Sequence, residues 1–219
     1  MVVDDHPIVR EGIAKLVNQE TDLTICGEAE DAPQALKALA ELKPDIAIVD
    51  ITLKEGLGGI GLIKDIKARH PKLPVLVLSM HDESLYAERT LRAGAKGYIM
   101  KQEAPEKVVE AIRRVLGGEI YLSEEMGQKI IHKLVEGKPE AGGSPIESLS
   151  DRQLEVFQLM GRGFGTRQIA DNLHLSVKTI ETYREHIKEK LKLKNATELV
   201  QHAIRWAQSE NTGSFKVPS

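Results

Sequence analysis

The sequence predicts an α/β protein with a doubly wound, five-stranded parallel sheet, followed by a second, smaller all-α domain. Three features of its 219 residues lead to this expectation. Short apolar runs alternate with amphipathic stretches over residues 1–118, as strands alternate with crossover helices. A segment rich in glycine and proline, residues 137–145, then interrupts the pattern. After it, the apolar residues have helical spacing.

The composition is that of a globular protein, with 41% hydrophobic and 29% charged residues. No apolar run approaches the roughly 20 residues that cross a bilayer, so no membrane association is expected. The single cysteine, Cys26, and the absence of a secretory signal predict a cytoplasmic protein. The seven histidines lack ligand spacing, so we expect no structural zinc.

The net charge of −3 is unevenly distributed along the chain. Residues 148–207 contain 10 Lys and Arg against 7 Asp and Glu, whereas the rest contains 20 against 26. The C-terminal part is therefore the better candidate for a contact with nucleic acid.

The strands of the first domain are predicted from short apolar runs that are too short for helices. They are Met1–Val3, Leu23–Cys26, Ile46–Val49, Val75–Leu78 and Tyr98–Met100. Between the runs, apolar residues recur every three or four positions, which predicts helices with one buried face. The last of these helices ends near Gly117, which gives a first domain of residues 1–118.

Polar side chains stand at the carboxyl ends of four predicted strands: Asp4 and Asp5, Asp50, Ser79 and Lys101. In a parallel sheet these ends line one crevice, so the five residues should meet there. Clustered carboxylates repel, and oxygen ligands favour Mg²⁺ as the neutralising cation. With Mg²⁺ and Lys101 in place, Asp50 can attack a phosphoryl group and Ser79 can donate a hydrogen bond to the acyl phosphate.

This set of residues, with Val3-Asp4-Asp5-His6-Pro7 and Tyr98, resembles the receiver domain of bacterial response regulators of the NarL/FixJ type. The resemblance implies a flavodoxin-like fold with Asp50 as phosphoacceptor. It also implies Mg²⁺ held by Asp4, Asp5, Asp50 and the Thr52 carbonyl. Ser79 and Lys101 would contact the phosphoryl group, and Tyr98 would be a switch aromatic that rotates inward as Ser79 moves.

Simpler interpretations exist for the single residues. An Asp-Asp pair alone is usually a solvated turn or helix cap, and Tyr98 alone would be a half-buried sheet aromatic. Met80 and His81 are expected to pack in a loop. The sequence also departs from the family, because Lys54 stands where a proline is common and the following loop to Gly59 is about one residue longer, which predicts an altered loop beside Asp50.

Residues 119–147 are predicted to be a linker. Its first part is a helix from Ser123 with Met126, Ile130 and Leu134 on one side. Its second part, rich in glycine and proline, is expected to be a flexible tether that lets the two domains dock or separate.

Residues 148–207 have the pattern of a helix-turn-helix domain. Ser150-Asp151-Arg152-Gln153 is a capping box at the start of a helix that stops at a glycine-rich segment. Helices over Thr166–Leu173 and Ser176–Leu191 then follow, joined by a tight turn. A solvated charged face is the simpler explanation of the second helix, but the domain resembles LuxR-type DNA-binding domains over about sixty residues.

That resemblance implies double-stranded DNA as the partner, with the helix from Val177 in the major groove. Base edges are expected to be read by Glu181, Thr182 and Glu185, and phosphates to be bound by Lys178, Thr179, Arg184 and Lys188. The last helix, Ala196–Trp206, is expected to expose Leu199, Val200 and Ala203 as a dimerisation face, with core packing as the alternative. Residues 208–219 are predicted to be a disordered tail.

The sequence thus predicts a two-component response regulator. A sensor histidine kinase phosphorylates Asp50, and homodimers bind DNA; the only catalysis is on the protein itself. One alternative is a DNA binder with a vestigial receiver that acts without phosphorylation. The other is a phosphohydrolase with an aspartyl nucleophile, which the absence of a second catalytic acid near Asp50 disfavours.

Overall fold

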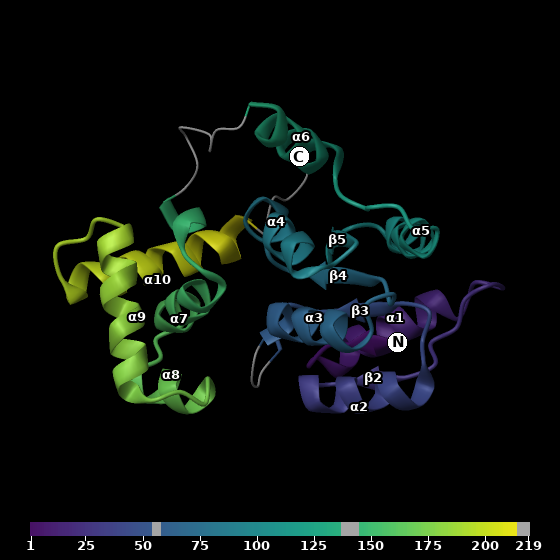
Figure 1. Cartoon of the computed structure of the whole chain (residues 1–219), viewed down its shortest axis with the longest axis horizontal. Helices are drawn as coiled ribbons and strands as arrows, with labels where there is room; N and C mark the ends of the chain where they lie inside the picture. Colours follow the sequence, from purple (N-terminus) through teal and green to yellow (C-terminus); the bar gives the residue numbers. More distant parts are fainter. Residues whose placement is uncertain (54–57, 137–144, 214–219) are drawn as a thin grey trace. The chain divides into compact units, whose positions relative to one another are not determined.

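The computed structural model describes residues 1–53, 58–136 and 145–213. The chain forms two compact units, Met1–Glu136 and Gly137–Ser219 (Figure 1). The first unit holds the sheet and its helices, and it includes the predicted linker helix as α6, Glu124–Glu136. The predicted tether lies mostly outside the described residues. Among the helices that the structure describes, none is long and apolar enough to span a bilayer.

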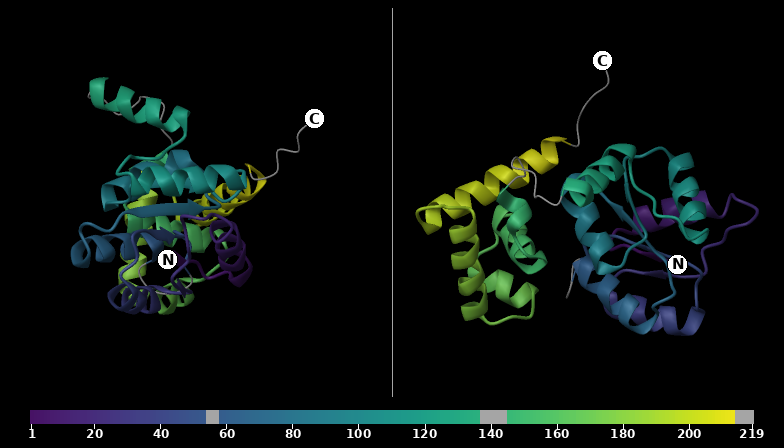
Figure 2. Two further views of the ribbon diagram at one scale, coloured as in Figure 1. Left: turned by 90° about the vertical axis from the view of Figure 1, so that its right-hand side faces the viewer. Right: turned by 45° about the horizontal axis from the view of Figure 1, so that its top comes forward.

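The first unit is a five-stranded parallel sheet, as predicted, and its strand order is β2-β1-β3-β4-β5. The strands are β1 (Val2–Val3), β2 (Glu28–Ala29), β3 (Ala47–Val49), β4 (Val75–Ser79) and β5 (Gly97–Met100). The helices are α1 (Pro7–Val17), α2 (Ala32–Leu42), α3 (Gly58–Arg69), α4 (Glu83–Ala93) and α5 (Pro105–Leu116). Helices α1 and α5 contact each other on one side of the sheet, and α2, α3 and α4 form a series on the other (Figure 2).

The two central strands are buried on both faces. Every residue of β3 and β4 is buried, which is why their sequences are continuous apolar runs rather than alternating ones. On the side of α1 and α5, Ile48 and Leu76 of the sheet pack with Ile112 and Val115 of α5. Strand β3 is thereby held rigidly, and Asp50 lies directly after its carboxyl end, at the edge of the sheet.

The second strand does not lie where the sequence predicted it. Val2 and Val3 pair with Glu28 and Ala29, whereas the apolar run Leu23–Cys26 is not a strand. Leu23 and Ile25 instead pack against the core, and the Ile25 N–H donates to the Asn18 side chain, 2.9 Å away, so it is not available to the sheet. The hydrophobicity of this run reports burial, not strand pairing.

The second unit is helical in its described part. Its elements are η1 (Pro145–Ser148), α7 (Asp151–Gly161), α8 (Thr166–Asn172), α9 (Val177–Lys190) and α10 (Ala196–Gly213). The capping box of Ser150 and Gln153 at the start of α7 is confirmed. Helix α10 continues past Gln208 to Gly213, so the expectation of a disordered tail from Gln208 is wrong over that stretch.

Helix α10 packs along α7. Leu199 is 1% exposed and Ala203 0%, and Trp206 stacks on Phe157 with ring centroids 5.4 Å apart. The expectation that Leu199 and Ala203 are exposed for dimerisation is therefore wrong, because their helix uses this apolar stripe to close the core of its own unit. Val200 is half-buried.

Candidate functional site

Three neighbouring strands of the first unit end in the same local turn. In each, the side chain at the end of the strand accepts a hydrogen bond from the backbone N–H two residues later, which reverses the chain sharply. The pairs are Asp4 with His6 at 2.9 Å, Asp50 with Thr52 at 3.1 Å and Ser79 with His81 at 3.1 Å. These turns fix the side chains that the sequence predicted at the edge of the sheet.

Lys101 joins two of those carboxylates. Its Nζ lies 2.6 Å from Asp4 Oδ2 and 2.7 Å from Asp50 Oδ2. The Lys101 N–H donates to the Ser79 carbonyl at 2.8 Å, so the backbone after β5 is tied to the end of β4. Asp4, Asp50 and Ser79 are each at most 3% exposed. The expected meeting of these residues at the carboxyl ends of the strands is thus seen in the structure.

Burial and neighbouring charge have opposite effects on the pKa values of Asp50 and Lys101. Burial raises the pKa of Asp50 above its ordinary value, against the lowering effect of the Lys101 ammonium. Burial alone would lower the pKa of Lys101, but the carboxylates of Asp50 and Asp4 outweigh it and raise that pKa. Lys101 is therefore a firmly protonated cation beside a carboxylate whose ionised form is poorly solvated by water.

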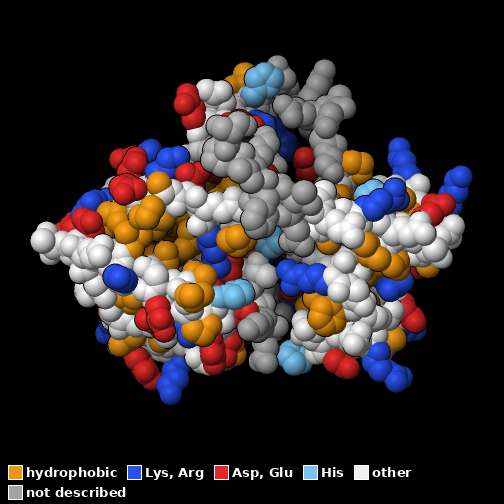
Figure 3. All heavy atoms as spheres, turned by 180° about the vertical axis from the view of Figure 1, so that it is seen from behind, with side chains coloured by type: hydrophobic (Ala, Val, Ile, Leu, Met, Phe, Trp, Pro, Cys, Tyr) orange, Lys and Arg blue, Asp and Glu red, His pale blue; other side chains and the backbone are white. Residues whose placement is uncertain are grey.

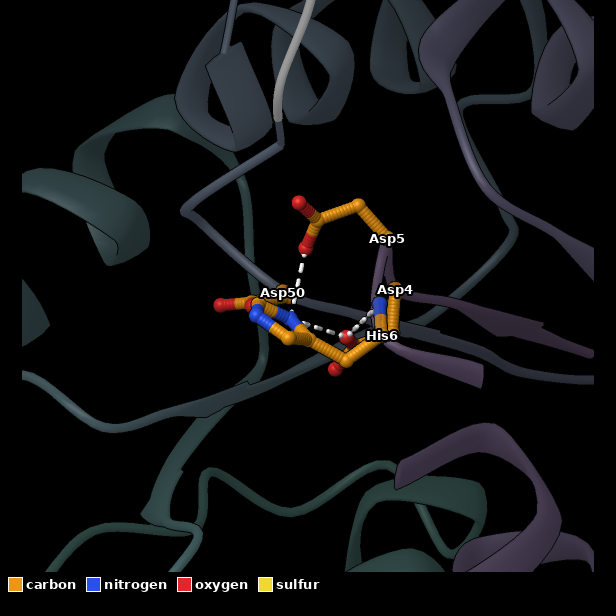
Figure 4. A group of neighbouring side chains, drawn as sticks. All are labelled: Asp4, Asp5, His6 and Asp50. Carbon is orange, nitrogen blue, oxygen red and sulfur yellow. Dashed lines mark hydrogen bonds and ion pairs between the residues drawn. The ribbon is translucent and has the colours of Figure 1, made fainter. Parts of the chain in front are cut away.

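Asp5 completes an acidic pocket with Asp4 and Asp50. One possible ligand atom from each of these residues and from His6 lies within 4.8 Å of the others (Figure 4). Three carboxylates at such a spacing, two of them balanced by one lysine, suit a hard divalent cation. Thr52, whose carbonyl the family resemblance assigns to the cation, follows Asp50 at the same strand end and donates its N–H to Asp50 Oδ1.

Ser79 and Tyr98 are both hydrogen-bonded to the backbone of His81. Ser79 is fully buried, and the Tyr98 hydroxyl donates to the His81 carbonyl at 2.8 Å. Tyr98 is only 1% exposed, and burial raises the pKa of Tyr98 well above its ordinary value, so the phenol stays protonated. The ring thus lies inside the unit and is not a half-buried surface aromatic.

Two histidines have closer contacts with the site than the sequence suggested. His6 Nδ1 lies 2.7 Å from Asp5 Oδ1, and His81 bonds to both Ser79 and Tyr98 through its backbone. A signal for His6 was available, since three possible ligands stand in a row in Asp4-Asp5-His6. His81 left no such signal because its contacts use main-chain atoms. Residues 54–57 of the loop predicted to be altered lie outside the described residues.

The residues predicted to bind DNA lie along α9 of the second unit. Its N-terminus is capped by Ser176, whose hydroxyl accepts from the Thr179 N–H at 3.0 Å. Four of these residues are exposed: Lys178, Glu181, Thr182 and Glu185. The other three are half-buried: Thr179, Arg184 and Lys188.

Three of the expected phosphate ligands have partners within the unit. The Thr179 hydroxyl lies 2.8 Å from the Ser176 hydroxyl. Arg184 donates to the Thr166 hydroxyl of α8 at 3.2 Å, and Lys188 forms an ion pair with Glu185. On the face shown in Figure 3, acidic and basic side chains are interspersed on the second unit. Lys178 is thus the exposed cation at the start of α9, two residues after the cap.

Comparison with known proteins matches both units to families. Residues 1–113 match the response regulator receiver domain, and residues 147–203 match the bacterial regulatory proteins of the luxR family. The oxygen regulatory protein NreC of Staphylococcus carnosus (strain TM300) is 33% identical over 208 residues, which are 94% of this chain and 96% of the relative.

Solved structures give the same result. RcsB from Salmonella enterica serovar Typhimurium, bound to promoter P1flhDC in the presence of the phosphomimetic BeF3−, is 30% identical with a TM-score of 0.68. That match covers 92% of this chain and 96% of RcsB. A LuxR-family two-component response regulator from Aurantimonas sp. SI85-9A1 is 37% identical with a TM-score of 0.57, over 62% of this chain and 96% of that one.

Proposed function

The chain belongs to the response regulators that join a receiver domain to a LuxR-type DNA-binding domain, and we propose that phosphorylation of Asp50 controls its binding to DNA. In this proposal residues 1–118 receive the phosphoryl group, residues 119–147 are the linker and residues 148–207 bind DNA. The donor is a sensor histidine kinase, the partner that a receiver domain implies. A regulator that binds the chromosome acts in the cytoplasm.

One observation carries the proposal: Asp50 ends a buried central strand with an ammonium 2.7 Å from one carboxylate oxygen. Because its other oxygen is held by the Thr52 N–H, the carboxylate cannot rotate freely. Asp50 is the nucleophile in the proposed step. A carboxylate oxygen forms a bond to phosphorus as the bond between phosphorus and the donor's imidazole nitrogen breaks, and the electron pair leaves with the imidazole.

The chain's own groups support that step. Lys101 is placed to hold the oxygens of the arriving phosphoryl group by charge, and the Ser79 hydroxyl to donate a hydrogen bond to one of them. Asp4, Asp5 and Asp50 fit Mg²⁺, which would neutralise charge between the carboxylates and the phosphoryl oxygens when bound. The family resemblance adds the Thr52 carbonyl as a further ligand. Water later removes the phosphoryl group, so the only catalysis acts on the protein itself.

On the DNA side, α9 is the proposed reader of the major groove. Its exposed Glu181, Thr182 and Glu185 are placed to contact base edges, and Lys178 to bind a phosphate. RcsB, which is similar over 92% of this chain, was solved on promoter DNA. We propose that two copies occupy paired half-sites.

The phosphoacceptor is tested by mass spectrometry of the full chain after incubation with acetyl phosphate and Mg²⁺. The wild type should gain one phosphoryl group and Asp50→Asn none. Asp45→Asn is the matched control, because Asp45 is an exposed acid immediately before the same strand. Unchanged labelling of Asp50→Asn, or unchanged DNA affinity after labelling of the wild type, would contradict the proposal.

The DNA interface is tested with fragments selected from the source genome. Lys178→Ala should weaken binding to every selected fragment and reduce by about one the slope of log affinity against log salt. Lys194→Ala, another exposed cation in the same unit, should leave the slope unchanged. Equal slopes for Lys178→Ala and the wild type would remove α9 from the interface.

A further inference from the structure

His6 points its ring into the acidic pocket. Its Nδ1 lies 2.7 Å from Asp5 Oδ1 and 3.2 Å from Asp4 Oδ1, and Figure 4 shows the imidazole turned back toward both carboxylates. The side chain is still 56% exposed, so its outer side faces solvent. Lys101 takes different atoms, the Oδ2 oxygens of Asp4 and Asp50. The pocket therefore has a lysine side and a histidine side.

The spacing on the histidine side is that of adjacent ligands around one cation. Two ligands at right angles on a six-coordinate ion, with bonds of about 2.1 Å, lie about 3 Å apart. The two measured separations from His6 Nδ1, 2.7 and 3.2 Å, fall on either side of that value. All the candidate ligand atoms of the group lie within 4.8 Å of one another, a limit close to the roughly 4.2 Å expected for ligands on opposite sides of such an ion.

On this geometry, we propose that His6 Nδ1 is a further ligand that lets the pocket bind late first-row divalent metals as well as Mg²⁺, and that it raises their affinity relative to that of Mg²⁺. The inference rests on the proposed cation site and adds to it. Carboxylates and water suit Mg²⁺, whereas imidazole suits Ni²⁺, Zn²⁺ and Fe²⁺. Asp4, Asp5 and His6 would supply protein donors from one stretch of the chain, and the exposed side of the imidazole faces solvent.

The competing explanation is a plain hydrogen bond, in which the imidazole donates Nδ1–H to Asp4 Oδ1 and moves aside when a cation enters. The two explanations differ in how the His6 side chain changes the ratio of the affinities for Ni²⁺ and Mg²⁺. A ligand raises the affinity for Ni²⁺ much more than that for Mg²⁺. A displaced hydrogen-bond donor lowers the affinity for both ions by a similar factor, because both must break the same bond.

The test is calorimetric titration of the full chain with Ni²⁺ and, separately, with Mg²⁺. His6→Gln should lose about tenfold or more in affinity for Ni²⁺ and change little for Mg²⁺. The backbone N–H that holds Asp4 is kept in this variant, so the turn survives. His70→Gln is the matched control, since His70 follows α3 and is not among the residues of the pocket.

A second measurement avoids relying on affinities alone. The Co²⁺-loaded chain should show a strongly shifted, solvent-exchangeable imidazole N–H resonance that is absent in His6→Gln and present in His70→Gln. Equal Ni²⁺ to Mg²⁺ affinity ratios in wild type and His6→Gln would overturn the inference while leaving the cation site in place. Absence of any cation binding that depends on Asp50 would overturn the proposed site itself.

Discussion

Gly59 holds α3 against the backbone of the predicted phosphoacceptor. Its N–H donates to the Ile51 carbonyl at 3.0 Å. A Cβ at this position would stand 2.2 Å from the Asp50 carbonyl oxygen and 2.3 Å from Ile51 Cα. Both neighbours are main-chain atoms and cannot rotate away. Gly59→Ala should therefore displace either the start of α3 or the end of β3.

The size of the displacement follows from the distances. An ordinary contact begins at 3.4 Å, so the Asp50 carbonyl and the new methyl group must separate by about 1.2 Å. Overpacking of this kind costs about 1–3 kcal/mol, against less than about 1 kcal/mol gained from helix propensity in the first turn of α3. A reacting group misplaced by about 1 Å can lose about a hundredfold in rate. We expect phosphorylation to slow by about tenfold to a hundredfold.

The assay is the initial rate of labelling by acetyl phosphate with Mg²⁺, with hydrogen exchange of the β3 amides as the measure of stability. Gly12→Ala is the control, because Gly12 lies in α1 with no atom within 4 Å of its new Cβ. That change should stabilise the unit by up to about 1 kcal/mol and leave the rate unchanged. If Gly59→Ala labels at the wild-type rate with unchanged protection of β3, the close approach of α3 does not position Asp50.

Two further predictions concern the second unit and share one signal, the fluorescence of Trp206, the single tryptophan of the chain. Gly161→Ala places a Cβ 2.5 Å from the Ala203 carbonyl oxygen. This overpacking should lower the urea midpoint of the second unit by about 1 M. An unchanged midpoint would mean that α7 and α10 can move apart freely. Burial raises the pKa of Glu155 despite the ion pair with Arg152 at 2.6 Å, so the folded unit retains a proton that the unfolded chain has lost. Stability should therefore fall as the pH rises from the ordinary pKa of glutamate through the raised one, and Glu155→Gln should flatten that fall; a parallel pH profile would contradict it.

The position of the candidate site could be predicted from the sequence, because a single rule about parallel sheets is sufficient to bring its residues together. Parallel strands end at the same edge, so any polar residue at those ends must meet its counterparts from neighbouring strands. Asp50, Ser79 and Lys101 are far apart in the chain but follow three apolar runs, and the sheet order brings them together. The sequence could not reveal which oxygen faces which cation, because that depends on the backbone turns after each strand.

Two of the errors in the fold have a common cause. An apolar run shows that a segment is buried, but not what buries it. The sequence predicts a strand at Leu23–Cys26, but Leu23 and Ile25 pack on the core without joining the sheet. It predicts an exposed face at Leu199 and Ala203, but both side chains are buried in the second unit, where α10 packs along α7. In both cases the structure depends on which other element packs against the segment. Hydrophobic spacing carries no information about that element.

His81 connects the site to the helices beyond it. Its N–H donates to Ser79, and its ring lies 4.9 Å from that of Tyr86 in α4. Helix α4 in turn carries Glu88, which binds Lys133 of α6 at 2.7 Å. In the proposed reaction the Ser79 hydroxyl donates to a phosphoryl oxygen and can still accept from the His81 N–H, because a hydroxyl has one donor and two acceptor positions. Any movement of Ser79 toward the phosphoryl group is therefore passed through this hydrogen bond to His81 and the turn before α4.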